Sequence, residues 1–384
     1  MTNRDSFPDA LRGFALIGIV LVNAPYLAMN TVLGLGGADI SNIWNLVSAF
    51  SITSLAMGKF YLLFSFLFGY SSVYILKSDK ANLRRWLARA VLLIFFGFLH
   101  AVFLWHGDIL FMYGLLAIAL VGLYFRSEKT IRQWVKVIYI GNAVLFSLFA
   151  LLLYVGELLG EDLGETMTTS SLDSSLAFGS FLDNAGARLE LWVTGLPGLL
   201  ALQAPLAFAA FLVGVLAARK RFLADGATAE TMKKLAVWGF AIGLPLQLIA
   251  AWFTLVNQQS VNYSVGVELG LFTATFVSAP VLSAGYLGVL WLLMQRYKRG
   301  FGLLAAAGRH SLTVYIGQSV ILAFVFSAWG LGLFGTLNLA VVTLIAFGSW
   351  LVLAALAALN SRYFSSGPLE WVLKKTTEPF RVKI

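Results

Sequence analysis

Long apolar runs recur along the whole chain, and no other feature constrains the fold more. Each run is near the roughly 20 residues that a helix needs to cross about 30 Å of hydrocarbon. The composition agrees, because 59% of the 384 residues are hydrophobic and only 12% are charged, with a mean hydropathy of +0.84. Soluble domains carry about 25% charged residues. The sequence therefore predicts an all-α, polytopic transmembrane helix bundle that forms a single integral membrane domain over residues 1–384.

About ten spans account for these runs. The apolar run from Trp44 to Leu76 has 33 residues, about 50 Å as a helix, which is too long for one upright span. A break near Gly58 resolves this, with an amphipathic or re-entrant segment over 43–57 and Lys59 at the outer boundary, its stem snorkelling. The expected spans are residues 8–29, 59–76, 86–103, a fourth that ends at 125, 137–159, 192–217, 235–256, 265–295, 311–329 and 338–359.

Basic residues set the expected orientation. With both termini cytoplasmic, 25 of the 27 lysines and arginines fall on the cytoplasmic side, and only Lys59 and Arg188 fall outside. This distribution satisfies the positive-inside rule, so we interpret the net charge of +9 as a topology signal and not as a nucleic-acid surface. The acidic segment 160–190 then becomes an extracytoplasmic loop, and residues 360–384 become a cytoplasmic tail.

Three further features narrow the class of protein. The chain contains no cysteine, which excludes disulfides and thiolate catalysis. Its first residues lead straight into an apolar helix without an A-x-A-like site, so we expect an uncleaved first span instead of a signal peptide. Three histidines and scattered carboxylates show no metal-ligand spacing, and we expect no metal site.

The hairpin between the third and fourth spans, GFLHAVFLWHGDILFMY, places ionisable groups between two apolar runs. Such groups are costly near hydrocarbon and usually line a cavity or meet a partner, which makes His100, His106 and Asp108 functional candidates. A structural alternative stays open for two of them. Asp108 can be the N-cap of the next helix, and His106 with Trp105 can be an interfacial anchor.

Polar patches also occur on the first and ninth spans. Asp9 and Arg12 are three residues apart and so share a helix face. They indicate either a phosphate-binding pair or an ordinary interfacial ion pair. On the ninth span, a polar stripe indicates either contacts between helices or a cavity wall; it comprises Ser311, Tyr315 and Ser319, with Gln318 on an adjacent ridge.

Five sequence blocks together resemble a known family. They are DALRGFALIGIVLVN, KFYLLFSFLFG, H-x4-WHGDIL, GRHSLTVYIGQS and GPLEW. In this order, across the whole chain, they resemble the YeiB-like bacterial membrane proteins, the group called domain of unknown function 418. The first span of that family is similar to those of heparan-glucosaminide acetyltransferases and of bacterial O-acyltransferases that modify surface sugars. The resemblance implies a bundle that uses cytoplasmic acyl-CoA, such as acetyl-CoA, as co-substrate, with an acceptor on the far side.

The resemblance also implies roles for particular residues. The CoA end would use Asp9, Arg12 and Arg309, together with Ser311 and Gln318. The chain departs from the O-acyltransferases at Asn23, because those enzymes have their catalytic histidine at this place. His100 is the natural substitute as base, with Asp108 orienting it. Asn23 or Tyr26 would polarise the acyl carbonyl.

We therefore expect a multi-pass protein of the bacterial inner membrane that moves an acyl group from acyl-CoA to a periplasmic or extracellular glycan or small molecule. The alternative is a transporter of a small metabolite, with His100, Asp108 and Glu268 as a proton relay. A scaffold without chemistry is a third interpretation. The lipid bilayer is the expected partner, no nucleic acid is expected, and the oligomeric state is open, a homodimer included.

Overall fold

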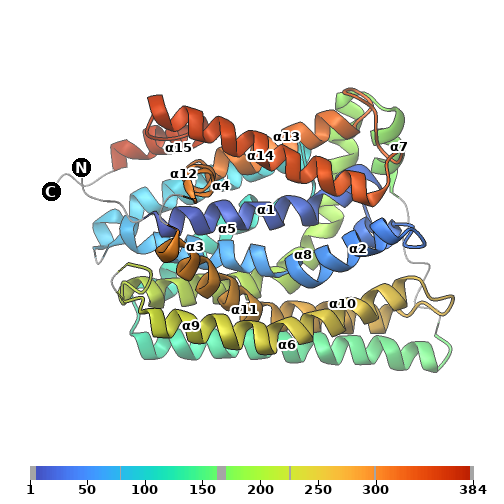
Figure 1. The fold of residues 1–384 in the computed structure, drawn as a ribbon, viewed down its shortest axis with the longest axis horizontal. Coiled ribbons are helices and arrows are strands. Elements are labelled where there is room, and N and C mark those ends of the chain that lie inside the picture. Colours follow the sequence, from blue (N-terminus) through green and yellow to red (C-terminus); the bar gives the residue numbers. More distant parts are fainter. Residues whose placement is uncertain (1–5, 78, 162–169, 225, 298–299, 381–384) are drawn as a thin grey trace.

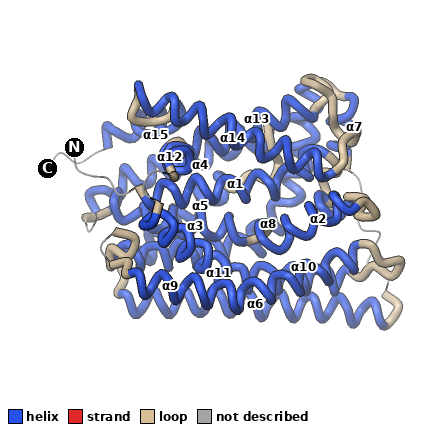
Figure 2. The backbone as a smooth tube through the Cα atoms, viewed as in Figure 1, coloured by secondary structure: helices blue, strands red, loops and turns tan. Residues whose placement is uncertain are grey.

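Helices fill the computed structural model, which describes residues 6–77, 79–161, 170–224, 226–297 and 300–380. Most of them run side by side along one axis (Figure 1), and loops and turns join them mainly at the two ends (Figure 2). The helices are α1 (Phe7–Ala28), α2 (Ile43–Ser51), α3 (Lys59–Leu76), α4 (Leu83–Phe103), α5 (Leu110–Tyr124), α6 (Glu128–Leu158), α7 (Ser171–Phe178), α8 (Phe181–Arg219), α9 (Ala229–Trp238), α10 (Leu244–Gln258), α11 (Val265–Arg296), α12 (Gly302–Arg309), α13 (Ser311–Phe326), α14 (Leu339–Tyr363) and α15 (Pro368–Thr377).

The length and composition of these helices confirm a polytopic membrane bundle. Within the described residues, eight helical segments are long and apolar enough to cross a membrane. The shorter apolar helices α5 and α13, of 15 and 16 residues, stand where we expected the fourth and ninth spans. The count of ten spans stays a prediction, because these two helices are too short to cross about 30 Å alone.

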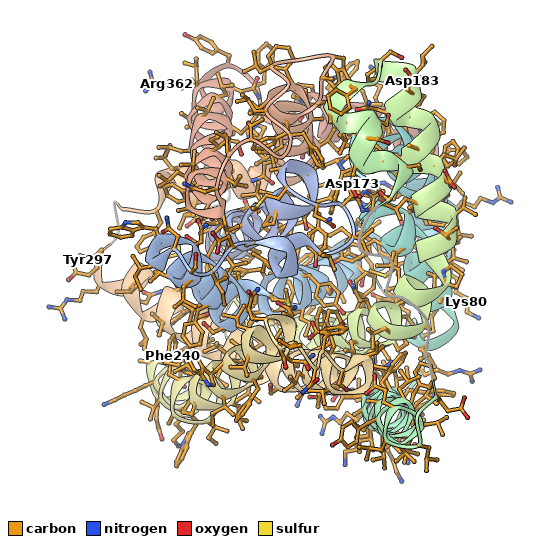
Figure 3. All side chains as sticks on the ribbon, turned by 90° about the vertical axis from the view of Figure 1, so that its right-hand side faces the viewer. Lys80, Asp173, Asp183, Phe240, Tyr297 and Arg362 are labelled. Carbon is orange, nitrogen blue, oxygen red and sulfur yellow. The ribbon has the colours of Figure 1, made fainter. Side chains whose placement is uncertain are left out.

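Both ends of the described chain lie at one end of the bundle, where α1 begins and α14 finishes (Figure 1). We call this the basic end, because α8 ends there at Arg219 and is followed directly by Lys220 and Arg221. At the opposite end, α7 packs against α8. Figure 3 looks onto that opposite end, with Asp173 of α7 near the middle of the molecule and Asp183 of α8 near its edge. The acidic segment, which we expected as a loop, thus contains the short helix α7, and residues 162–169 of that segment lie outside the described residues.

Helix α1 forms the centre of the bundle and packs against α3, α12, α13 and α14. Leu11, Leu16 and Ala24 on it are completely buried. The close contact between α1 and α12 depends on Gly308 of α12, because an added Cβ there would lie 1.7 Å from the Asp9 carbonyl oxygen. Helix α12 was not predicted, and Figure 1 shows it end-on, so that it crosses the axis of the bundle.

The predicted break near Gly58 is confirmed. A π-helical turn over Ile52–Ala56 follows α2, and Gly58 takes φ of 80°, which favours glycine. Lys59, which starts α3, does not snorkel as we expected. It is completely buried, and its Nζ donates to the Thr53 carbonyl of the π-helical turn at 2.9 Å. The broken helix leaves carbonyls without intrahelical donors, and this lysine supplies one donor.

The two helices that begin furthest before their predicted starts are α6 and α8. Helix α6 begins at Glu128 instead of residue 137, because the basic segment continues the helix beyond the apolar run. Helix α8 begins at Phe181 instead of residue 192, because a capping box of Ser180 and Asp183 starts it. The seventh predicted span is divided between α9 and α10 by a π-helical turn over Gly239–Gly243, just before Pro245.

Candidate functional site

The hairpin between α4 and α5 brings His100 and Asp108 together inside the bundle. Nδ1 of His100 lies 2.7 Å from Oδ1 of Asp108, and Oδ2 of Asp108 accepts the backbone N–H of Phe111 at 2.7 Å. Asp108 is therefore both the cap of α5 and the partner of the histidine. Gly97 permits the close packing, because a Cβ there would lie 2.1 Å from the Phe111 nitrogen.

A serine from α13 completes the arrangement. Nε2 of His100 lies 2.9 Å from Oγ of Ser319. Because the ring Nδ1–H donates a hydrogen bond to the Asp108 carboxylate, the lone pair of the neutral tautomer is at Nε2, and the serine hydroxyl donates to it. Ser319, His100 and Asp108 thus form a hydrogen-bonded chain with the geometry of a serine–histidine–aspartate relay. We call these residues the buried relay.

The buried relay is closed in this structure. His100 is 2% exposed, Asp108 is completely buried and Ser319 is 4% exposed. From the sequence we expected His100 to line a cavity or to meet a partner. It meets partners, and its ring lies behind the wall formed by Ile109 and Tyr315, with the Tyr315 ring centroid 5.0 Å from its own.

A polar cavity of about 240 Å³ lies on the basic side of that wall. Three arginines from three helices line it, namely Arg12, Arg89 and Arg309. Arg12 pairs with Asp9 at 2.7 Å and also donates to Oγ of Ser71. Guanidinium groups offer planar forks to phosphate oxygens, so this inner cavity suits a phosphate-bearing ligand.

The carboxylate of Glu370, from the GPLEW block, closes one side of the inner cavity. Its Oε1 accepts the backbone N–H groups of Leu312 and Thr313 at 2.7 and 3.1 Å, and its Oε2 accepts the Thr313 hydroxyl at 2.6 Å. Glu370 on α15 therefore caps the first turn of α13, where unpaired N–H groups and the helix dipole favour a negative charge.

Replacing Glu370 with alanine is expected to lower the free energy of unfolding by about 1–2 kcal/mol, the usual cost of a lost N-cap. Thermal unfolding of the purified protein in detergent measures this. Glu378→Ala is the control, because Glu378 is exposed and lies outside the inner cavity. Equal stability of the two variants would show that the cap does not stabilise α13.

A second pocket of about 390 Å³ lies toward the opposite end and also has polar lining residues. Asn23 and Tyr26 of α1 line this outer pocket, as do Trp105 and His106 of the hairpin. Nε1 of Trp105 is buried and has no hydrogen-bond partner among the described residues. Trp105 is only 4% exposed, which does not fit an interfacial anchor.

His106 is not suited to be a base. Burial and, second, the positive charge of Arg188 lower its pKa to about 3. The ring is therefore neutral at physiological pH and takes up a proton poorly, since an efficient general base has a pKa near the operating pH. His100 remains the candidate base of the hairpin.

The inner cavity and the outer pocket meet at one residue. Ile109 lines both of them, and it directly follows Asp108 of the buried relay. Its backbone N–H lies 3.4 Å from the Tyr315 hydroxyl, a long hydrogen bond and thus a weak closure of the wall. The break in the helix at Met57 and Gly58 lines the outer pocket as well.

The remaining predicted residues lie in different places. Ser311 lines the inner cavity. Gln318 is buried and donates to the Leu16 carbonyl at 3.2 Å, so it joins α13 to α1. Glu268 of α11 accepts hydrogen bonds from the Asn257 and Gln258 amides of α10 at 3.1 and 2.7 Å. Its carboxylate therefore contacts α10 and lies apart from the buried relay.

Comparisons with known proteins agree with the sequence blocks. The family described as "Protein of unknown function (DUF418)" matches residues 217–379, which include Arg309, Ser319 and Glu370. "Uncharacterized protein YxaH" of Bacillus subtilis (strain 168) is 27% identical, covering 96% of this chain and 93% of its own. "Uncharacterized protein YeiB" of Escherichia coli (strain K12) is 26% identical, covering 96% and 95%. The chain is therefore similar to the DUF418 family over residues 217–379, and to these two uncharacterized proteins over almost its whole length.

Sequence reasoning missed several residues of this candidate site. Arg89 counts in the sequence only as a topology charge, although it sits two helical turns inside α4 and faces the inner cavity. Ser319 belongs to the predicted polar stripe, but no spacing rule joins it to a histidine 219 residues away. For Glu370, the short GPLEW block is the signal that the sequence contains.

Proposed function

We propose that this protein is a membrane-embedded acyltransferase. It takes an acyl group from acyl-CoA at the basic end and passes it to a glycan or small-molecule acceptor at the opposite end. On this proposal the basic end faces the cytoplasm and the protein lies in the bacterial inner membrane. The observation that supports it most is that the inner cavity and the outer pocket share Ile109, beside the buried relay.

The inner cavity has the chemistry for the donor. Acyl-CoA carries phosphates, and Arg12, Arg89 and Arg309 offer charge-assisted hydrogen bonds to their oxygens. Tyr315 lines the end of this cavity and packs on the His100 ring. A donor that is held by its phosphates at the arginines can therefore direct its thioester toward the buried relay.

The buried relay has the chemistry for the transfer. An acceptor hydroxyl donates to Oγ of Ser319 while the serine donates to Nε2 of His100, and Asp108 stabilises the imidazolium that forms. The acceptor oxygen bonds to the acyl carbon, the carbon–sulfur bond breaks, and the proton passes from His100 to the leaving thiolate. Asn23 and Tyr26 offer donors to the carbonyl oxygen. Access requires the Ile109–Tyr315 wall to open.

Arg89→Gln tests the donor site. Loss of one charge-assisted hydrogen bond is expected to raise KM for acyl-CoA roughly 10- to 100-fold, with kcat nearly unchanged. The assay follows transfer of radiolabelled acetyl groups by purified protein in nanodiscs, with a panel of sugars and amines as acceptors. Arg84→Gln on the same helix is the control, because Arg84 is exposed and lies outside the inner cavity. The proposal would be contradicted if the protein neither bound acetyl-CoA nor transferred its acetyl group to any acceptor of the panel.

A specific observation favours the second candidate, transport of a small metabolite. Lys59 is completely buried next to the broken helix that lines the outer pocket. Transporters place discontinuous helices and buried charges at the bilayer midplane. Lys59 lies near that depth, because the adjacent Phe60 packs on Gly18 in the middle of α1. Flux into liposomes that depends on pH, without acyl transfer, would favour this function.

A further inference from the structure

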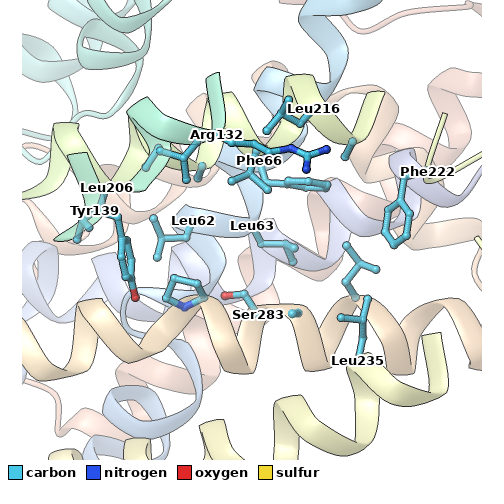
Figure 4. Close-up of a pocket in the computed structure, with 18 of the residues that line it drawn as sticks. Leu62, Leu63, Phe66, Arg132, Tyr139, Leu206, Leu216, Phe222, Leu235 and Ser283 are labelled. Carbon is cyan, nitrogen blue, oxygen red and sulfur yellow. The ribbon is translucent and has the colours of Figure 1, made fainter. Parts of the chain in front are cut away.

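An apolar groove on the side of the bundle has no role in the proposed function. It lies between α3, α6, α8, α9 and α11 and has a volume of about 580 Å³ (Figure 4). Along α8 it extends from Leu206 to Lys220, which is about 21 Å at 1.5 Å per residue. That length is more than half of a hydrocarbon core about 30 Å thick, on the side of the basic end. We call it the lateral groove.

Helix packing explains why the lateral groove exists. Helices α6 and α11 touch toward the opposite end, where a Cβ added to Gly266 would lie 2.4 Å from the Tyr154 nitrogen. Toward the basic end, both helices line the groove, α11 from Pro280 onward and α6 from Tyr139 back to Arg132. The proline interrupts the hydrogen-bond ladder of α11, a usual cause of a bend.

The interior of the lateral groove suits hydrocarbon. Leucine, valine, alanine and phenylalanine provide most of its surface. Its polar groups have partners within the protein, because Tyr139 donates to the Val277 carbonyl, and Ser283 donates to the Lys59 and Ala279 carbonyls. An empty apolar space forfeits dispersion contacts, so a chain that fills it is favoured.

Two positive charges line the same groove. They are Arg132 of α6 and Lys220 at the end of α8. Figure 4 shows the Arg132 guanidinium close to Leu216, away from Tyr139. Arg132 pairs with Glu128 at 3.1 Å, but the two side chains are 54% and 40% exposed, and such a pair contributes little and can be displaced.

We propose that the lateral groove binds an anionic phospholipid of the leaflet at the basic end. One acyl chain fills the apolar interior, and the headgroup phosphate binds Arg132 and Lys220. Basic pockets between transmembrane helices recognise anionic headgroups in this way. The opening of the groove beside α6 supports a lipid occupant, because the buried residues of that helix are Ile131, Asn142 and Ala150, and many of its apolar side chains are exposed on the surface of the bundle.

Native mass spectrometry of the full-length protein tests the headgroup site, with dioleoyl phosphatidylglycerol and dioleoyl phosphatidylethanolamine as probes. The wild type is expected to bind phosphatidylglycerol more tightly. The double variant R132Q/K220Q should bind it roughly 30-fold more weakly, because each substitution removes one positive charge that attracts the phosphate. The matched control is K129Q/K136Q, which removes two charges of α6 that lie outside the groove, and it should bind as the wild type does.

A second variant tests the chain site. Ala210→Trp fills the apolar interior and leaves both charges in place, so it should abolish retention of either lipid in a protein that still elutes as a single species. The proposal is overturned if the wild type binds the two lipids equally, or if R132Q/K220Q or Ala210→Trp binds phosphatidylglycerol like the wild type. Neither assay depends on acyl-CoA, so failure here leaves the proposed acyl transfer untouched.

Discussion

Replacing His100 with alanine is expected to reduce acyl transfer by about 10²- to 10⁴-fold, the range for loss of a general base. The same change should lower the free energy of unfolding by about 1.5–3 kcal/mol, because it removes a hydrogen bond to the buried Asp108 carboxylate. Transfer of radiolabelled acetyl groups and denaturant unfolding in mixed micelles measure the two effects. This is the largest change that we expect from a single substitution.

The control for stability is His310→Ala. His310 is also buried, but its partners are neutral, the Ala306 carbonyl at 2.9 Å and the Asn360 amide at 3.1 Å. Its loss leaves no buried charge, so it should cost less than the loss of His100. The double variant His100→Ala/Asp108→Asn removes the charge and should recover part of the lost stability. Additive effects of the two substitutions would contradict a direct interaction between His100 and Asp108.

Gly308→Ala is expected to destabilise the protein by about 3 kcal/mol, at the upper end of the usual range for overpacking. The new Cβ would meet the Asp9 carbonyl oxygen at 1.7 Å and the Gly13 nitrogen at 2.9 Å. Since both belong to the backbone of α1, no side chain can yield, and α12 must move. Movement of α12 displaces Arg309 from Arg12, so acyl-CoA binding should weaken as well.

Gly302→Ala is the matched control on the same helix, because nothing lies within 4 Å of the Cβ that it adds. Alanine is a better helix former than glycine by about 0.8–1.0 kcal/mol, so this variant should be as stable as the wild type or slightly more stable. Unfolding in mixed micelles compares the two. If both variants had the wild-type stability, the close contact between α1 and α12 would not be what holds the inner cavity together.

Much of the fold could be predicted because the membrane imposes one solution on an apolar run. The first and eighth predicted spans agree with α1 and α11 to within one residue at each end. The predicted start of a helix is wrong where the helix continues beyond the apolar run, as in α6. The charges of Lys129, Arg132 and Lys136 predict a loop, but water solvates these charges equally well on the surface of a continuing helix.

The candidate site could be predicted only in part. His100 and Asp108 are eight residues apart, so a tight hairpin was enough to predict their contact. Ser319 and Arg89 reach the site through helix packing, which depends on close approaches such as Gly97 against Phe111 and not on local spacing. The buried position of Lys59 depends on the π-helical turn before it, which no pattern in the sequence predicts.

The most direct measurement is a cryo-electron microscopy structure of the protein in nanodiscs with a non-hydrolysable acyl-CoA analogue. The proposed function predicts phosphate density at Arg12, Arg89 and Arg309, and acyl density between Ile109 and Tyr315 next to His100. The proposed function would be contradicted by an analogue that binds elsewhere. It would also be contradicted if, at a saturating concentration of the analogue, the inner cavity held no ligand and Ile109 and Tyr315 stayed in contact.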